Sequence, residues 1–241
     1  MAEWIYGKNL IKQRLMEEKE IHTLFLLEGQ TDKEILALAK QKKVPVQFVD
    51  RKKMDTYAKG GKHQGVIAEI DSYRYYELEE ILNSIPKGKT PLLVMLDGVE
   101  DPHNLGAVLR TCDAVGVDGV LLGKHRSVNL NAATVAKVSV GAIETVKVAE
   151  VTNLNQTIKQ LKEKGYWICG SEMNAMDYRK ADFTIPLVLV VGSEGFGISS
   201  LVKKNCDFLV SVPMQGKINS LNVSVATGVL LYEVLKQRFP V

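Results

Sequence analysis

Short apolar runs and amphipathic stretches alternate at the start of the chain, with turn residues between them. A run of about four to eight apolar residues bounded by turn residues is typical of a strand, whereas apolar positions that recur every three to four residues predict a helix. This alternation predicts a small α/β unit. We expect helices at 7–17 and 32–42, strands at 23–27, 45–49 and 66–70, and a short helical piece before the turn KGGKHQG.

The stretch from Asp71 to Thr90 is polar and rich in tyrosine, with one short helix followed by PKGKT. Such a loss of hydrophobic periodicity is typical of a connection between domains. We therefore expect an N-terminal domain at 1–70, a connecting segment at 71–90 and a C-terminal domain at 91–241.

Alternation of strands and helices resumes from Pro91. Strand, helix, strand in this order is typical of a mostly parallel sheet with helices on both faces. The fold class expected for the C-terminal domain is therefore α/β. The expected strands are 92–96, 119–122, 145–148, 166–170, 187–191 and 208–212, and the expected helices are 104–116, 131–139, 153–164, 198–204 and 221–238.

The composition, 46% hydrophobic and 24% charged, is that of an ordinary soluble globular protein. No apolar run approaches the ~20 residues that span a bilayer, and the N-terminus carries no secretion signal, so we expect a cytoplasmic protein. The cysteines, Cys112, Cys169 and Cys206, are isolated in apolar surroundings and are expected in the core. The histidines lack the spacing of metal ligands, so no metal site is expected.

Positive charge is concentrated near the N-terminus. Residues 1–70 contain 13 Lys and Arg against 10 Asp and Glu, whereas the remaining residues contain 18 of each, so the net charge of +3 lies entirely in the first 70 residues. Within 33–62 the imbalance rises to 9 basic against 3 acidic residues. Such a cluster is typical of a surface that binds polyanions. A solvated lysine-rich surface has the same composition, so charge alone leaves both interpretations open.

Three polar turns in the C-terminal domain follow predicted strands, where ligands bind in open α/β sheets. The first is LDGVEDPHNLGAVLRTCDAVG, residues 96–116. Asn104 is a good helix N-cap, and apolar residues follow it at helical spacing. Gly106, Arg110 and Asp113 share another side of that helix, so Arg110 is presented to its surroundings and Gly106 leaves room for a ligand. The alternative is a solvated ion pair between Arg110 and Asp113.

The second turn, VVGSEGFGIS at 190–199, places Glu194 among three glycines. Glycine permits backbone conformations and close approaches that a side chain prevents. The dinucleotide fingerprint G-x-G-x-x-G is absent, as is the Gly-Lys-Ser/Thr of a Walker loop. These absences argue against a nicotinamide, flavin or Walker-type nucleotide site.

The third turn lies in VPMQGKINSLNVSVATGVLLYEVL, residues 212–235. A strand ends near Pro213, and either Ser220 or Asn222 caps a long helix. That helix is apolar on more than one side, which is typical of a helix covered by more than its own sheet. A subunit interface and burial within a single subunit are both consistent with this pattern.

Together, DPHNLGAVLRTCDA, VVGSEGFGIS and VPMQGKINSLNVSVATGVLLYE closely resemble the three motifs of the SpoU family of RNA ribose 2′-O-methyltransferases, part of the SPOUT superfamily. The resemblance covers essentially the whole chain, because YGKNLI and GGKHQGVIA resemble the family's N-terminal substrate-binding domain, whose fold is similar to ribosomal protein L30e. Within the family, the chain is most similar to members that methylate a guanosine of bacterial 23S rRNA. A member that modifies tRNA and a non-catalytic RNA-binding protein are the alternatives.

The resemblance implies features that periodicity and composition do not show. In this family the C-terminal polypeptide threads a loop to form a deep trefoil knot, and the knot forms the pocket for S-adenosylmethionine. General rules of topology treat knots as nearly absent. The resemblance also implies that two copies pair through the motif-bearing helices, so the expected partners are RNA and a second copy of the chain.

The resemblance further implies roles for individual residues. Arg110 is expected to meet the phosphate and 2′-hydroxyl of the target nucleotide. Because a guanidinium stays protonated in nearly any protein setting, alignment suits it better than proton removal, and the general base is left unassigned. The other expected catalytic residues are Asn104, Glu194, Ser220 and Asn222. The expected cofactor residues are Gly192, Val212, Met214, Ser220 and Leu221, and the expected RNA contacts are Lys52, Lys53, Lys62, His63 and Gln64.

Overall fold

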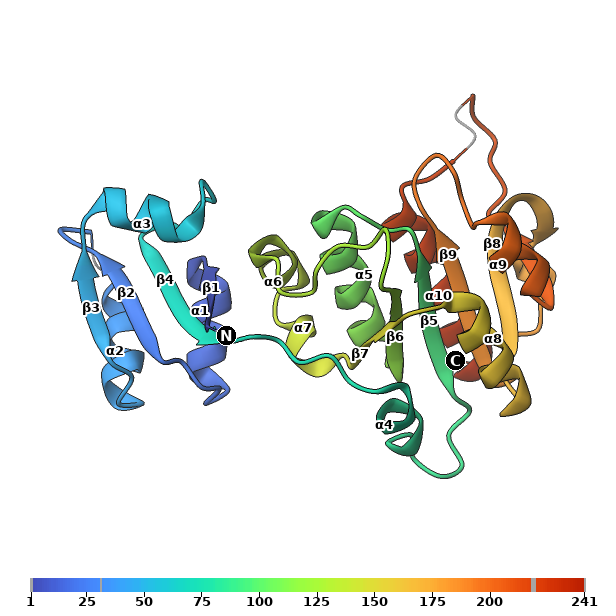
Figure 1. Cartoon of the computed structure of the whole chain (residues 1–241), viewed down its shortest axis with the longest axis horizontal. Helices are drawn as coiled ribbons and strands as arrows, with labels where there is room; N and C mark the ends of the chain where they lie inside the picture. Colours follow the sequence, from blue (N-terminus) through green and yellow to red (C-terminus); the bar gives the residue numbers. More distant parts are fainter. Residues whose placement is uncertain (1, 31, 218–219, 241) are drawn as a thin grey trace.

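The strands of the protein form two separate sheets in two lobes (Figure 1). A computed structural model describes residues 2–30, 32–217 and 220–240. The N-terminal lobe, residues 2–71, contains a four-stranded sheet, and the C-terminal lobe, residues 72–240, contains a six-stranded sheet. The two lobes meet along helices that lie between the sheets.

The sheet of the N-terminal lobe has the strand order β1-β4-β2-β3, in which only β2 and β3 run parallel. Helix α3 covers one face, around Phe25 and Met54, and α1 and α2 cover the other, around Leu24 and Leu26. The expected strands and helices are present, and the structure adds the edge strand β1. The elements are β1 (Ala2–Tyr6), α1 (Lys8–Met16), β2 (Thr23–Leu27), α2 (Lys33–Gln41), β3 (Val46–Val49), α3 (Arg51–Ala58) and β4 (Val66–Asp71).

The sheet of the C-terminal lobe has the strand order β10-β8-β9-β5-β6-β7, and every neighbouring pair is parallel. The predicted α/β fold with a mostly parallel sheet is confirmed. Its strands are β5 (Leu92–Asp97), β6 (Gly119–Gly123), β7 (Val148–Val151), β8 (Trp167–Asp177), β9 (Leu187–Gly192) and β10 (Phe208–Ser211).

Alternate residues of the central strands bury opposite faces of this sheet. On β5, Leu92 and Val94 join a core with α5, α6, α7 and α10, whereas Leu93 and Met95 join a core with α4, α8 and α9. Both faces are therefore covered, which explains the uninterrupted apolar runs of the strands. The helices are α4 (Leu78–Asn83), α5 (Pro102–Val115), α6 (Ala133–Ser139), α7 (Ala142–Thr145), α8 (Leu154–Glu163), the 3-10 turn η1 (Tyr178–Lys180), α9 (Ser200–Asn205) and α10 (Val223–Arg238).

The expected strand at 145–148 is wrong in position. The structure has the short helix α7 there, ending at Thr145, and β7 begins only at Val148. Gly141, with a φ of 91°, starts this helix directly after α6. The apolar residues of a short helix and of a short strand look alike in sequence, so periodicity over so few residues does not distinguish them.

The cysteines belong to the interior, as expected. Cys112 and Cys169 are fully buried, and Cys206 is half-buried with its thiol donating to the carbonyl of Val202 at 3.4 Å. Burial raises the pKa of Cys206 to about 11. The thiol is therefore protonated near neutral pH, as in a structural cysteine.

The segment that follows β4 is bound to the C-terminal lobe. Tyr73 exchanges backbone hydrogen bonds with the carboxamide of Asn131, and the Tyr75 hydroxyl accepts from the backbone N–H of Leu130 at 2.8 Å. Further along, Ile81 of α4 is fully buried against the sheet. The tyrosine-rich segment thus holds the chain against one lobe.

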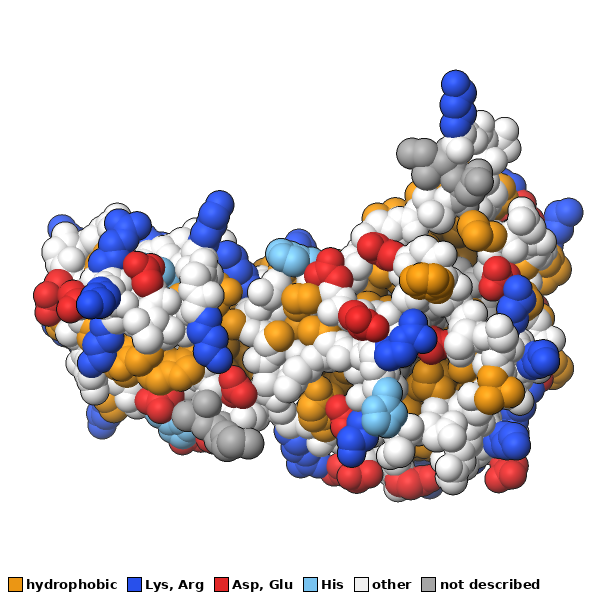
Figure 2. Space-filling model, turned by 45° about the horizontal axis from the view of Figure 1, so that its top comes forward, with side chains coloured by type: hydrophobic (Ala, Val, Ile, Leu, Met, Phe, Trp, Pro, Cys, Tyr) orange, Lys and Arg blue, Asp and Glu red, His pale blue; other side chains and the backbone are white. Residues whose placement is uncertain are grey.

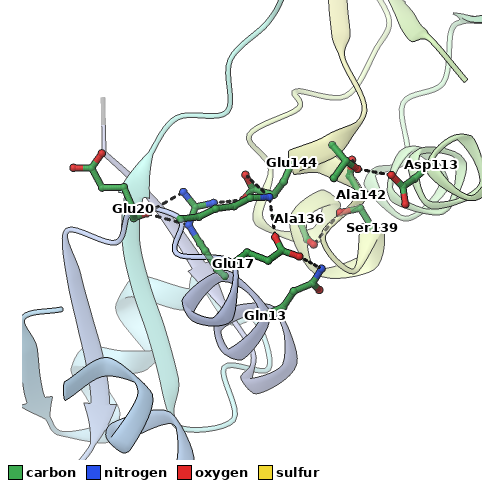
Figure 3. Close-up of polar contacts among 11 residues, drawn as sticks. Gln13, Glu17, Glu20, Asp113, Ala136, Ser139, Ala142 and Glu144 are labelled. Atoms are coloured by element: carbon green, nitrogen blue, oxygen red, sulfur yellow. Dashed lines mark hydrogen bonds and ion pairs between the residues drawn. The ribbon is translucent and has the colours of Figure 1, made fainter. Parts of the chain in front are cut away.

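An ion pair joins the two lobes (Figure 3). Arg14 of α1 pairs with Glu144 of α7, and both side chains are largely buried. Arg14 also donates to the carbonyl of Glu20 at 3.0 and 3.1 Å, which keeps its guanidinium in place within the N-terminal lobe. On the other side, the Thr145 hydroxyl donates to Asp113 of α5 at 2.5 Å. The contact between lobes therefore reaches the helix that carries the first polar turn.

Glu144→Gln is expected to weaken the docking of the two lobes. The change removes the charge that faces a buried guanidinium, at a cost on the order of 2 kcal/mol. Small-angle scattering should show a larger radius of gyration, and trypsin should cut faster after the exposed Arg74. Glu34→Gln is the matched control, because Glu34 pairs with Lys12 within the N-terminal lobe. Equal scattering and cleavage for wild type and Glu144→Gln would contradict this expectation.

Candidate active site

The chain order of the larger sheet reverses between β5 and β9, which lie side by side at its centre. From β5 the chain continues outward through β6 and β7, and then returns to the opposite side of the sheet. The crevice outside the carboxyl ends of two such strands is where open α/β sheets bind ligands. Here those ends are Asp97 and Gly192, which are paired in register.

The first polar turn connects β5 with α5. Asp97 accepts a hydrogen bond from the backbone N–H of Ser199 at 2.7 Å and so links this turn to the one that follows β9. The N-cap of α5 is Asp101, whose carboxylate accepts from the backbone N–H of His103 at 2.8 Å. The expectation that Asn104 is the N-cap is therefore wrong. Because Asp101 takes this role, the buried side chain of Asn104 is available for other contacts.

The second polar turn is a tight hairpin. Ser193 and Gly197 exchange two backbone hydrogen bonds of 3.0 and 3.2 Å, and Gly195 and Gly197 have φ values of 84° and 64°. A Cβ atom on Gly192 would lie 2.0 Å from the carbonyl carbon of Gly197. Glycine is therefore required at these positions, as the sequence predicts. The hairpin projects Glu194 beyond the end of β9.

The third polar turn connects β10 with α10. Asn222 is the N-cap of α10: its side-chain oxygen accepts from the backbone N–H and the hydroxyl of Ser224 at 2.9 and 2.6 Å. The predicted cap at Asn222 is confirmed. Ser220 is exposed just before it. Two residues of this motif, 218–219, lie outside the described residues.

Side chains from the three turns meet in one hydrogen-bonded group, which we call the Asn–Glu–Asn cluster: Asn104, Glu194 and Asn222. Asn104 donates to Glu194 Oε1 at 3.0 Å. Asn222 donates to Asn104 Oδ1 at 2.9 Å and also to Glu194 Oε1. Residues up to 118 positions apart in sequence are thus joined within one subunit.

A cavity of about 510 Å³ lies beside this cluster. Its volume is in the range of sites that bind drug-sized or cofactor-sized ligands. Apolar residues such as Val191 and Val223 and the polar Glu194 share its lining. The lining also contains every residue that the sequence analysis assigns to the cofactor: Gly192, Val212, Met214, Ser220 and Leu221.

Arg110 lies outside the cluster. It is exposed on α5, six positions after Asn104, which places it about 9 Å further along the helix and on another side. Within the described residues it forms no ion pair, and Asp113 instead accepts a hydrogen bond from Thr145. The solvated Arg110–Asp113 pair is therefore not formed, and the guanidinium is presented as expected.

Gly106 does not leave room for a ligand. A Cβ atom on Gly106 would lie 2.7 Å from Cβ of Val138 and 3.1 Å from the carbonyl oxygen of Val135. Helix α6 occupies the space that the missing side chain leaves. This glycine therefore serves the packing of two helices, and the expectation of a ligand at this point is wrong.

The expected RNA contacts lie on α3 and on the turn KGGKHQG of the N-terminal lobe. Lys52, Lys53, Lys62 and Gln64 are exposed, and Figure 2 shows many Lys and Arg side chains on this lobe. His63, in contrast, is buried: its ring pairs with Asp55 at 3.1 Å and accepts from the backbone N–H of Gly65 at 3.0 Å. The position of His63 therefore fits a residue that holds the turn in shape.

Two contributions to the cavity are not found by sequence reasoning. Strand β8 extends past the expected end at 170, and four residues of this extension, 171–174, line the cavity. Phe196, in the tight hairpin, also lines it. The largely polar residues after 170 do not predict a strand. In contrast, a phenylalanine between two glycines of a turn is a signal in the sequence that an exposed ring lies there.

Neither a metal site nor a membrane span is found in the described part of the chain. Across residues 2–30, 32–217 and 220–240, no group of three or more His, Cys, Asp or Glu side chains could hold a metal ion. Within the same residues, no helix combines the length and apolar character that crossing a bilayer requires.

Solved structures of methyltransferases share this fold. The SpoU methyltransferase AviRb from Streptomyces viridochromogenes, solved with AdoMet, superposes with a TM-score of 0.80 over 98% of this chain and 90% of that one, at 22% identity. An AdoMet-bound rRNA methyltransferase from Sinorhizobium meliloti superposes with a TM-score of 0.79 over 99% of this chain and 88% of that one, at 24% identity. The fold is therefore that of the SpoU class of methyltransferases.

The sequence comparisons agree. Residues 91–232 match the SpoU rRNA Methylase family, and residues 4–76 match the family of RNA 2′-O ribose methyltransferase substrate-binding domains. A protein of Bacillus subtilis strain 168, named as the TrmH family tRNA/rRNA methyltransferase YacO, is 44% identical over 99% of this chain and 97% of that protein. This chain belongs to the SpoU family of RNA methyltransferases, and the family predicted from the three turns is confirmed.

Proposed function

We propose that this protein transfers a methyl group from S-adenosylmethionine to a ribose 2′-hydroxyl of RNA, with one guanosine of 23S rRNA as the target. Membership of the SpoU family supports an RNA methyltransferase that uses this donor. The observation that carries the proposal is the Asn–Glu–Asn cluster, because it joins three separate turns at the wall of one cavity. A protein that only bound RNA would not need this arrangement.

The cavity suits an adenosine-containing donor. Val212 and Leu221 offer apolar surfaces for the adenine ring, and backbone groups of Gly192, Val212 and Leu221 are proposed to bind its polar edge and the ribose, with Met214 and Ser220 beside them. When bound, S-adenosylmethionine supplies an electrophilic methyl group on a sulfonium.

The cluster is proposed to position the acceptor. Asn104 and Asn222 both donate to Oε1 of Glu194, which fixes the carboxylate at the edge of the cavity. Within the described residues Oε2 has no hydrogen-bond partner, so it can accept from the ribose hydroxyl. The hydroxyl proton passes to Glu194 or to water. Ser220 is proposed to contact the nucleotide at the same edge.

Arg110 is proposed to bind the phosphate of the target nucleotide and to align its 2′-hydroxyl. A positioned cation lowers the cost of charge that develops on the attacking oxygen. Because a guanidinium remains protonated, this role is electrostatic.

A homodimer is proposed to complete the site. Helix α10 buries one side against α5 but exposes Val225 and Tyr232 by 51% and 54%. Pairing of two copies through this surface would cover both side chains and bring the neighbouring α5, with Arg110, to the interface. This supports a subunit interface, rather than burial within a single subunit, as the cover of the apolar helix.

The finer fold assignments are also proposals. We propose an RNA-binding domain similar to L30e at residues 1–70, a connecting segment at 71–90 and a knotted methyltransferase domain at 91–241. The turns after β9 and β10, which would form the knot, line one cavity. Exposed Lys52, Lys53, Lys62 and Gln64 would supply RNA affinity without sequence specificity in the cytoplasm.

Calorimetric titration with S-adenosylmethionine tests the cavity, and mapping of 2′-O-methyl marks in cells that lack this gene tests the target. We expect binding to the purified protein and loss of one guanosine mark from 23S rRNA, which the purified protein restores. Loss of a tRNA mark instead would refute the rRNA target and favour the tRNA alternative. Absence of donor binding by the folded protein would favour a non-catalytic RNA-binding protein.

A further inference from the structure

Phe196 is the most exposed large apolar side chain among the described residues, at 87%. A single exposed apolar residue is common on protein surfaces. This one, however, lines the cavity, together with two other exposed apolar side chains, Met173 and Met214. The mouth of a site that faces RNA therefore has an apolar rim with one aromatic ring.

Hydrogen bonds restrain the backbone that carries this ring. Phe196 lies inside the hairpin that the backbone bonds between Ser193 and Gly197 close, and Gly192 packs directly against the carbonyl of Gly197. A flexible loop would lose conformational entropy when it bound a ligand. A ring on a closed hairpin loses little conformational entropy on binding, because only its two side-chain torsions become ordered.

The ring is also close to the acceptor side of the cavity. Only Gly195 separates Phe196 from Glu194, so the Cα atoms of these two residues lie within ~7 Å of each other. A nucleotide whose ribose meets Glu194 therefore has its base within reach of Phe196. Single-stranded RNA is bound by stacking unpaired bases on aromatic side chains.

We propose that Phe196 stacks on the base of the nucleotide whose ribose is methylated. This proposal rests on the proposed 2′-O-methyl transfer and names a substrate contact within that site. The ring selects for an unstacked base and positions the ribose attached to it. Because every base has a π-face, the contact does not read the identity of the base.

The test compares wild type with Phe196→Ala and Phe196→Tyr, using total RNA from cells that lack this gene as acceptor and S-adenosylmethionine as donor. Phe196→Ala should lower kcat/KM for RNA about 5- to 160-fold, the range expected for loss of one base–aromatic stack. Phe196→Tyr keeps an aromatic ring and should remain within about threefold of wild type. Leu201→Ala is the matched control, because Leu201 is 59% exposed and does not line the cavity.

Three results would overturn the proposal. The first is a kcat/KM of Phe196→Ala within twofold of wild type. The second is a loss of kcat/KM accompanied by an equal loss of affinity for S-adenosylmethionine. The third is a changed oligomeric state of Phe196→Ala in sedimentation. The second result would assign the ring to the donor, and the third would assign it to a subunit contact. A further comparison uses an RNA in which the target nucleotide lacks its base: wild type and Phe196→Ala should methylate it equally.

Failure of the proposed function gives a different pattern. Wild type itself would then place no methyl group on ribose, as nuclease digestion to single nucleosides would show. If only the stacking proposal fails, wild type still methylates ribose, and the kcat/KM of Phe196→Ala is close to that of wild type.

Discussion

Replacing Arg110 with lysine is expected to lower kcat/KM for methyl transfer by at least about 100-fold, the typical effect of removing a donor that stabilises developing charge. Lysine keeps the charge but loses the planar fork that binds two oxygens at once. Since Arg110 lies outside the cavity lining, the affinity for S-adenosylmethionine should stay within about twofold of wild type in calorimetric titration.

Arg74→Lys provides the control for this experiment, because Arg74 is exposed and pairs with Glu80 far from the sheet edge that carries the site. It should leave transfer unchanged. Near-full activity of Arg110→Lys would remove Arg110 from the mechanism. A parallel loss of donor binding would instead place Arg110 in the cofactor site.

Replacing Asn222 with aspartate is expected to separate stability from activity. Aspartate caps a helix as well as asparagine does, so α10 should keep its N-terminal cap. The new carboxylate, however, would face Oε1 of Glu194 where an amide now donates. Like charges at hydrogen-bonding distance repel, and the cluster should open. We expect methyl transfer to fall at least about 100-fold.

The comparison with Asn222→Ala makes this test specific. Alanine removes the cap and should cost about 1 kcal/mol of stability, but it adds no charge beside Glu194. The aspartate variant should therefore be the more stable of the two and yet no more active. Asn153→Asp is the matched control, because Asn153 caps α8 in the same way at another position. An active Asn222→Asp enzyme would show that Glu194 needs no amide donor at this position.

The elements around the site could be predicted because their signals are local. Apolar runs of buried parallel strands, the glycines at 192, 195 and 197 and a capping residue such as Asn222 are each visible within a few positions. The residues of the three turns are also sufficient to predict the family. In contrast, the assignment of Asn104 as a cap was wrong because Asp101, three positions earlier, offers the same chemistry.

Contacts between distant parts of the chain could not be predicted in this way. No local pattern indicates that Asn104 meets Glu194, 90 positions away, because the strand order that joins them is a property of the whole sheet. The same limit explains Gly106, whose small size suggested a ligand but serves α6. Likewise, the buried ring of His63 pairs with Asp55 of α3. The residues of the turn KGGKHQG alone do not indicate this contact.

The packing of α6 sets the separation between the lobes. One side of α6 is pressed onto Gly106 of α5, and another reaches the N-terminal lobe, where Lys137 lies over the ring of Tyr6 and Ala133 packs beside its core. These contacts oppose a change in the spacing between the exposed Lys52, Lys53 and Lys62 and the cavity. An RNA lengthened by one helical turn between its anchoring stem and its target nucleotide should escape modification, whatever its base sequence.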